Sequence, residues 1–148
     1  GTVQVTGSSS LARFTRAALA QQSPRDPADD PVMKAFAALA DVAQSGRTQW
    51  SIVYDPAKRT VHWHTRGNTA IRSLTLDGIA ASCATPPLFV DIDEGESDIA
   101  RLFRPFTSAD NEKLILATFK ATPFLAHIDE AALRQSARWP DSALCVAE

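Results

Sequence analysis

Three successive segments in the middle of the chain alternate between mainly apolar and mainly polar side chains. Short connections separate them. The segments span Gln49–Asp55, Thr60–Arg66 and about Thr69–Leu76. Such alternation places successive side chains on opposite faces of a β-strand. The connection between the first two segments begins with Pro56, whose restricted φ suits the first central position of a turn. The sequence therefore predicts three antiparallel strands in a meander.

Two helices are predicted before these strands. The first runs from about Ser10 to Gln22, and the serine hydroxyls at its start can cap it. The second begins at Pro31, which fits the first helical turn, and Gly46 is its expected stop. Each helix carries one apolar stripe at helical spacing. The stripes consist of Leu11, Phe14 and Ala18 in the first helix and of Val32, Phe36, Leu39 and Ala43 in the second.

The remainder of the chain predicts one more strand and two more helices. We expect a short strand at Leu88–Ile92, an acidic loop over Asp91–Asp98, a helix over Asp110–Phe119 and a last helix that Asp129 caps and that ends near Arg138. Helices and strands are thus grouped along the chain. This order is typical of an α+β fold with an antiparallel sheet. We expect residues 1–148 to form a single unit, either one domain or a part of one.

The net charge and the lengths of the apolar runs limit the classes of partner that are expected for this chain. The formal charge is −2 at pH 7, which does not favour nucleic acid or an acidic membrane surface. No apolar run approaches the ~20 residues that cross a bilayer. The first residues, Gly1 to Val5, lack the basic and apolar regions of a signal peptide, so none is expected in this sequence.

Few residues form a pattern that points to chemistry. His62, His64 and Arg66 share one strand face, and two histidines with no third ligand indicate a solvated outer face more than a metal site. The acidic run lacks the regular oxygen spacing of a calcium loop. Cys83 and Cys145 can be two separate buried thiols or one disulfide. We therefore predict no metal and no cofactor.

Three stretches resemble the C-terminal half of the choloylglycine hydrolase family. They are Gly7-Ser8-Ser9-Ser10-Leu11-Ala12-Arg13-Phe14-Thr15-Arg16-Ala17, Thr48-Gln49-Trp50-Ser51-Ile52-Val53-Tyr54-Asp55, and Thr65-Arg66-Gly67-Asn68 followed by Ile71-Arg72-Ser73-Leu74. The resemblance covers roughly residues 5–125. Its first two motifs are fairly specific when they occur together. The family includes bile salt hydrolases and penicillin V acylases, which hydrolyse linear amide C–N bonds.

The resemblance implies an N-terminal-nucleophile hydrolase fold, in which two antiparallel sheets are sandwiched between helical layers. It also implies a cysteine nucleophile whose own α-amino group accepts the thiol proton. One residue of the family's active site falls on this chain, namely Arg13. A guanidinium beside the sulfur favours the thiolate and can stabilise charge on the carbonyl oxygen. Phe14, which follows Arg13, is expected to face the core.

The sequence departs from the family at its first residue. Gly1 stands where a nucleophilic cysteine would be, and family members are about twice as long. We therefore expect a partner, either an N-terminal half that carries the cysteine or a second copy of the chain, and no amide hydrolysis by this chain alone. The substrate would be a small amide such as a conjugated bile acid, penicillin V or an N-acyl homoserine lactone. Family habit and the pair of cysteines favour a periplasmic or secreted location.

Two alternatives remain. The chain could be a non-catalytic binding or assembly module that kept the fold and lost the chemistry. It could also be an unrelated α+β domain, and a sheet order different from two stacked antiparallel layers would favour that interpretation.

Overall fold

The computed structural model describes residues 6–22, 28–79 and 85–142. The chain is α+β, as predicted, and it divides into two compact units. The first unit is Gly1–Ile79 with Asp91–Leu102, and the second is Ala80–Val90 with Phe103–Glu148. The expectation of a single unit over residues 1–148 stays a prediction, because two compact units can belong to one larger domain.

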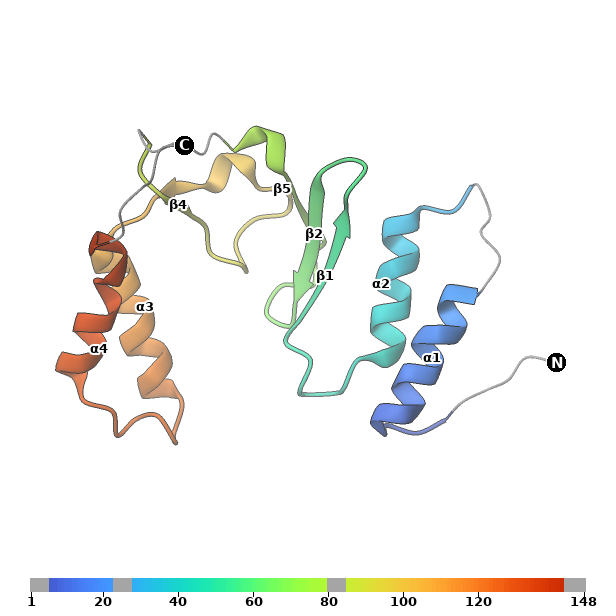
Figure 1. The fold of residues 1–148 in the computed structure, drawn as a ribbon, viewed down its shortest axis with the longest axis horizontal. Helices are drawn as coiled ribbons and strands as arrows, with labels where there is room; N and C mark the ends of the chain where they lie inside the picture. The colour runs from blue at the N-terminus through green and yellow to red at the C-terminus, as the bar shows by residue number, and fades with distance from the viewer. Residues whose placement is uncertain (1–5, 23–27, 80–84, 143–148) are drawn as a thin grey trace. The chain divides into compact units, whose positions relative to one another are not determined.

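The sheet of the first unit contains the predicted meander (Figure 1). Its antiparallel strands are β1 (Trp50–Asp55), β2 (Thr60–Thr65) and β3 (Arg72–Thr75). A fourth strand, β5 (Ser97–Asp98), lies parallel to β3, so the order is β1-β2-β3-β5. The sequence predicted no strand at β5, because this segment read as an acidic loop.

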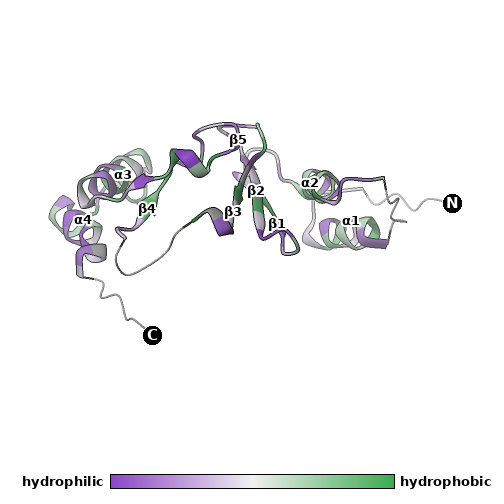
Figure 2. Cartoon of the chain, turned by 90° about the horizontal axis from the view of Figure 1, so that it is seen from above, coloured by the Kyte–Doolittle hydropathy of each residue, from purple (hydrophilic) through white to green (hydrophobic). Residues whose placement is uncertain are grey.

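Two helices of the same unit, α1 (Ser10–Gln22) and α2 (Pro31–Val42), pack against each other as a hairpin. The Ala12 backbone N–H donates to Ser9 Oγ at 3.2 Å, which confirms the predicted serine cap. α2 ends before the predicted stop at Gly46. Figure 2 shows hydrophobic residues along both helices and strongly hydrophilic ones on α1 as well.

The apolar stripe predicted for α1 is not the buried side of this helix. Leu11 and Phe14 are 75% and 70% exposed, whereas Ala12 is buried. The expectation that Phe14 faces the core is therefore wrong in this structure. The physical reason is that α1 packs on α2 through its other side, and helical spacing alone does not reveal which side a neighbour covers.

The core between α2 and the sheet lies on the histidine face of β2. Phe36 is 5% exposed, and its ring lies 5.3 Å from that of His64. His62 and His64 are both half-buried, so the interpretation of a solvated outer face is wrong for them; only Arg66, beyond the end of β2, is exposed. The polar imidazole nitrogens of the two histidines favour a position in solvent, but α2 covers this face of the sheet.

The opposite face of the sheet is covered at its centre and open at its β1 end. Trp63 donates its indole N–H to the Ile92 carbonyl at 3.1 Å, so the 91–102 segment lies over the centre of this face. On β1, the same face carries Trp50 and Tyr54, which are 60% and 69% exposed. The apolar residues at the β1 end of this face are therefore uncovered within the described part of the first unit.

The second unit is a short antiparallel pair followed by two helices. β4 (Leu88–Phe89) pairs with β6 (Arg104–Pro105), and α3 (Ser108–Ala121) packs against α4 (Glu130–Ala137). The Ala132 backbone N–H donates to Asp129 Oδ2 at 3.0 Å, which confirms the predicted cap of the last helix. Three 3-10 turns complete the described elements: Leu76–Gly78 and Ala100–Leu102 in the first unit and Trp139–Ser142 in the second.

No helix in residues 6–22, 28–79 and 85–142 has both the length and the apolar character that a bilayer-spanning helix needs.

Candidate functional site

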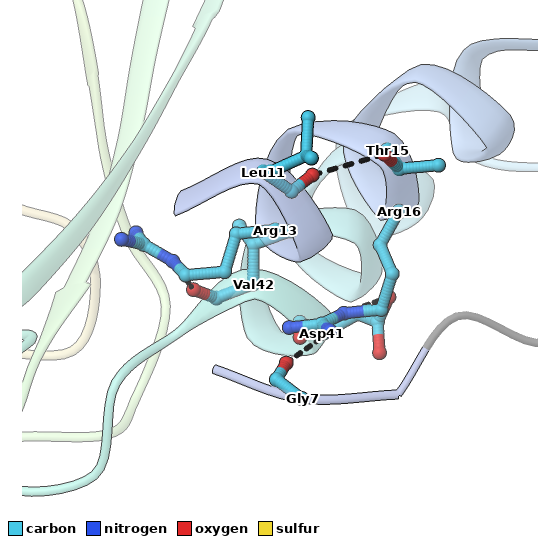
Figure 3. A network of polar contacts seen from close by, with 7 residues as sticks. All are labelled: Gly7, Leu11, Arg13, Thr15, Arg16, Asp41 and Val42. Atoms are coloured by element: carbon cyan, nitrogen blue, oxygen red, sulfur yellow. Dashed lines mark hydrogen bonds and ion pairs between the residues drawn. The ribbon is translucent and has the colours of Figure 1, made fainter. Parts of the chain in front are cut away.

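Arg13, the predicted active-site residue, lies in the first turns of α1 and extends past the end of α2. Its Nε donates a hydrogen bond to the carbonyl of Val42 at 2.7 Å (Figure 3). Val42 is the last residue of α2, where carbonyls lack partners within the helix. This bond holds the guanidinium at one edge. Among the described residues, no hydrogen-bond or ion-pair partner is found for its terminal nitrogens Nη1 and Nη2.

The guanidinium lines an open pocket of about 370 Å³ between the end of α2 and strand β1. The lining combines apolar side chains with several hydroxyl groups. Besides Arg13, it consists of Leu39, Val42, Ala43, Thr48, Trp50, Ser51, Ile52 and Tyr54. A planar fork whose terminal nitrogens have no partner among the described residues, beside apolar side chains, is suited to an oxyanion, a carboxylate or a thiolate.

Two of the three resemblance motifs meet at this pocket. The first contributes Arg13 from α1, and the second contributes residues between Thr48 and Tyr54, more than thirty positions later in the chain. Both motifs are visible in the sequence, but their convergence at one pocket was not predicted. Their convergence depends on the α1–α2 hairpin, which places Arg13 beside the loop that leads into β1.

No nucleophile with a general base stands among the described lining residues. They include no cysteine, histidine or carboxylate. Ser51 is buried, and the Thr48 hydroxyl accepts a hydrogen bond from the Gln44 backbone N–H at 2.9 Å. A serine or threonine nucleophile needs an adjacent base to lose its proton. The described pocket therefore supplies a cation and an apolar wall but no attacking group.

The third motif surrounds a different arginine, Arg72, whose side chain is completely buried. Its guanidinium lies 5.8 Å from the Trp63 ring and donates through Nη1 to the carbonyls of Asn68 and Ala70 at 3.3 and 3.1 Å. Asn68 in turn donates to the carbonyls of Asp93 and Gly95. Arg72 thus joins the β2–β3 connection to the sheet. The burial of Arg72 is not predictable from the sequence, since an arginine beside Ser73 gives no sign of burial.

The other residues considered for chemistry serve local structure. In the part of the chain that the structure describes, no group of three or more metal-ligating side chains is assembled. Asp91 and Asp98 accept hydrogen bonds from backbone N–H groups two residues later. Cys83 and Cys145 lie outside the described residues, so their pairing stays a prediction.

Comparison with protein-family models and with curated proteins finds no match for this chain.

Proposed function

We propose that this chain is the C-terminal portion of a cysteine-dependent N-terminal-nucleophile hydrolase of the choloylglycine hydrolase type, which cleaves linear amide C–N bonds. One observation carries the proposal. The two more specific motifs of the resemblance, distant in sequence, line one pocket, and the two terminal guanidinium nitrogens of Arg13 have no partner among the described residues. Chance similarity in two separate stretches gives no reason for them to meet.

Arg13 has a defined chemical role in this proposal. The attacking sulfur belongs to a cysteine of the missing N-terminal half, and its α-amino group takes the thiol proton. The guanidinium stabilises the thiolate before attack and the carbonyl oxygen during attack. The sulfur bonds to the carbonyl carbon, the C–N bond breaks, the amine leaves with a proton, and water hydrolyses the resulting thioester. The apolar lining of the pocket suits an acyl group of the substrate.

The exposed sheet face supports the same proposal. In a sandwich of two sheets between helical layers, each sheet has helices on one face and the other sheet on its second face. Here α2 covers the histidine face, and the 91–102 segment lies over the centre of the opposite face, but Trp50 and Tyr54 at the β1 end of that face are exposed. A second sheet from the missing half would cover them. Two stacked antiparallel sheets are therefore part of the proposal, as is a partner that supplies one of them.

The substrate would be a small linear amide, such as a conjugated bile acid, penicillin V or an N-acyl amide. The location in this proposal is periplasmic or secreted. It follows the family resemblance and the two cysteines, Cys83 and Cys145.

The proposal is tested by Arg13→Lys in the complete enzyme, meaning this chain together with the half that carries the cysteine. Lysine keeps the positive charge but loses the planar fork. We expect kcat/KM for amide hydrolysis to fall by about 100-fold or more, with the circular dichroism spectrum unchanged. Arg47→Lys is the matched control, because Arg47 lines a neighbouring pocket beside Trp50. Near-normal turnover by a folded Arg13→Lys enzyme would remove Arg13 from the mechanism.

A non-catalytic binding or assembly module is the second candidate function. It is favoured by the lack of a nucleophile and base among the described lining residues. Mass spectrometry of the native material distinguishes the two functions. A second chain, or an N-terminal extension, that begins with cysteine supports the hydrolase, and this chain alone as the complete native material supports the module.

A further inference from the structure

We infer that Arg16 is a positioning residue for the Arg13 fork and acts through the last turn of α2. This inference rests on the proposed function, since it assumes that the fork of Arg13 faces the reacting groups. Arg16 follows Arg13 by three positions on α1, so the two side chains leave neighbouring points of one helix face.

Arg16 connects three parts of the chain. Its Nε donates to the Asp41 carbonyl at 3.2 Å and lies 3.4 Å from the Asp41 carboxylate (Figure 3). Its Nη1 donates to the Gly7 carbonyl at 2.7 Å. The Arg16 side chain is 18% exposed, whereas the Asp41 side chain is 58% exposed, so the hydrogen bonds lie at the surface. One guanidinium thus holds the segment before α1 and the end of α2 together.

The two arginines hold consecutive carbonyls. Arg16 binds the carbonyl of Asp41, and Arg13 binds that of Val42. Both belong to the end of α2, where unpaired carbonyls carry partial negative charge and favour cations. Because the Val42 carbonyl is the described partner of the Arg13 guanidinium, its position sets the direction of the Arg13 fork. An interaction that holds the last turn of α2 at Asp41 therefore also holds the direction of the Arg13 guanidinium.

A purely structural role for Arg16 makes a different prediction. If Arg16 only stabilised the α1–α2 hairpin, its loss would lower the free energy of unfolding and leave the chemistry of the folded enzyme unchanged. If it positions Arg13, its loss also weakens the effect of Arg13 on the nucleophilic sulfur in molecules that are still folded. The reactivity of that sulfur as a function of pH separates the two roles.

The experiment measures the pH dependence of iodoacetamide alkylation at the N-terminal cysteine of the complete enzyme, with the alkylated peptide identified by mass spectrometry. The variants are Arg16→Gln, Arg16→Lys and Arg13→Gln. The matched control is Asp29→Asn, which removes the Lys34–Asp29 ion pair near the other end of α2, also 3.4 Å long. kcat and KM for an amide substrate are measured in parallel.

We expect Arg16→Gln to move the alkylation profile toward higher pH, in the same direction as Arg13→Gln, and to lower kcat by about 10- to 100-fold with little change in KM. Asp29→Asn should leave the profile unchanged. Arg16→Lys keeps the charge but lacks the planar fork, so its shift should be intermediate. If Arg16→Gln does not fold, the Arg16→Lys profile decides the question.

The outcomes separate the two proposals. A shifted profile in Arg13→Gln with an unshifted profile in folded Arg16→Gln, or in Arg16→Lys where the glutamine variant does not fold, overturns the positioning role and leaves the proposed function intact. An unshifted profile and unchanged turnover in Arg13→Gln overturn the proposed role of Arg13, and the positioning role with it. An equal shift in Asp29→Asn and Arg16→Gln would mean that general loosening of α2 causes the effect, which also overturns the positioning role.

Discussion

The role of a single residue in this chain depends on the neighbours that surround its side chain. Arg13 and Arg72 are both arginines within resemblance motifs, but Arg13 lines an open pocket and Arg72 is fully buried beside Trp63. Gly95 is another residue whose surroundings are decisive. Its φ is +78°, a conformation that favours glycine. A Cβ at this position would also meet the side chains of Leu102 and Ile99.

Replacement of Gly95 by alanine should destabilise the first unit more than the same change at Gly46. Both glycines have positive φ, but nothing lies within 4 Å of a Cβ built at Gly46. We expect Gly46→Ala to cost about 1–2 kcal/mol from backbone strain and Gly95→Ala about 1–3 kcal/mol more from overpacking. Urea unfolding of the two variants measures the difference. Equal losses would show that the Leu102 and Ile99 side chains yield without cost.

At the scale of elements, α2 is the helix that organises the first unit. Asp30 accepts a hydrogen bond from the Val32 N–H at 2.9 Å at its start, and Pro31 occupies the first turn. Arg13 and Arg16 bind its last carbonyls. Its buried side packs on α1 and β1. Both ends of α2 are therefore fixed by side chains, and the pocket lies at the C-terminal end.

Removal of the N-terminal cap of α2 should have a measurable cost. Asp30→Ala leaves the Val32 N–H without its described partner, and we expect a loss of about 1 kcal/mol in the free energy of unfolding. Asn accepts the same hydrogen bond, so Asp30→Asn should stay close to the parent chain. Thermal or urea unfolding of both variants tests this prediction. A similar loss in both would indicate that the carboxylate charge matters more than the hydrogen bond.

At the scale of the whole molecule, the prominent feature is the apolar β1 end of the sheet, which no described residue of the first unit covers. Strand β1 stands at the edge of the described sheet, and its Trp50 and Tyr54 are largely exposed. Edge strands and contiguous apolar surfaces tend to associate with other chains. The proposed partner, an N-terminal half with its own sheet, would remove both exposures.

We expect the isolated 16.0 kDa chain to self-associate through this surface. The double change Trp50→Ser and Tyr54→Ser should raise the monomer fraction in sedimentation velocity, because it removes apolar area from the proposed contact. Trp139→Ser is the matched control: Trp139 is 71% exposed and lies in the second unit. A monodisperse monomer of the unchanged chain with one cooperative melt would contradict the expected partner.

Local patterns predicted much of the secondary structure. The caps at Ser9 and Asp129, the proline that begins α2 and the three-strand meander all appear at or near the expected residues. These features depend on interactions between residues close in sequence, such as a side-chain oxygen that accepts an N–H two or three positions later. The resemblance of the surrounding motif also predicts a catalytic role for Arg13, and this role stays a prediction.

Only the tertiary structure decided which surfaces are covered and which distant residues meet. Alternation defines two faces of a strand but does not say which one a helix will cover, and here α2 covers the face of His62 and His64. The burial of Arg72, the pairing of β5 with β3 and the meeting of Arg13 with the β1 segment depend on contacts between residues far apart in the chain. Burial is a property of neighbours in space, and the position of those neighbours follows from packing of the whole unit.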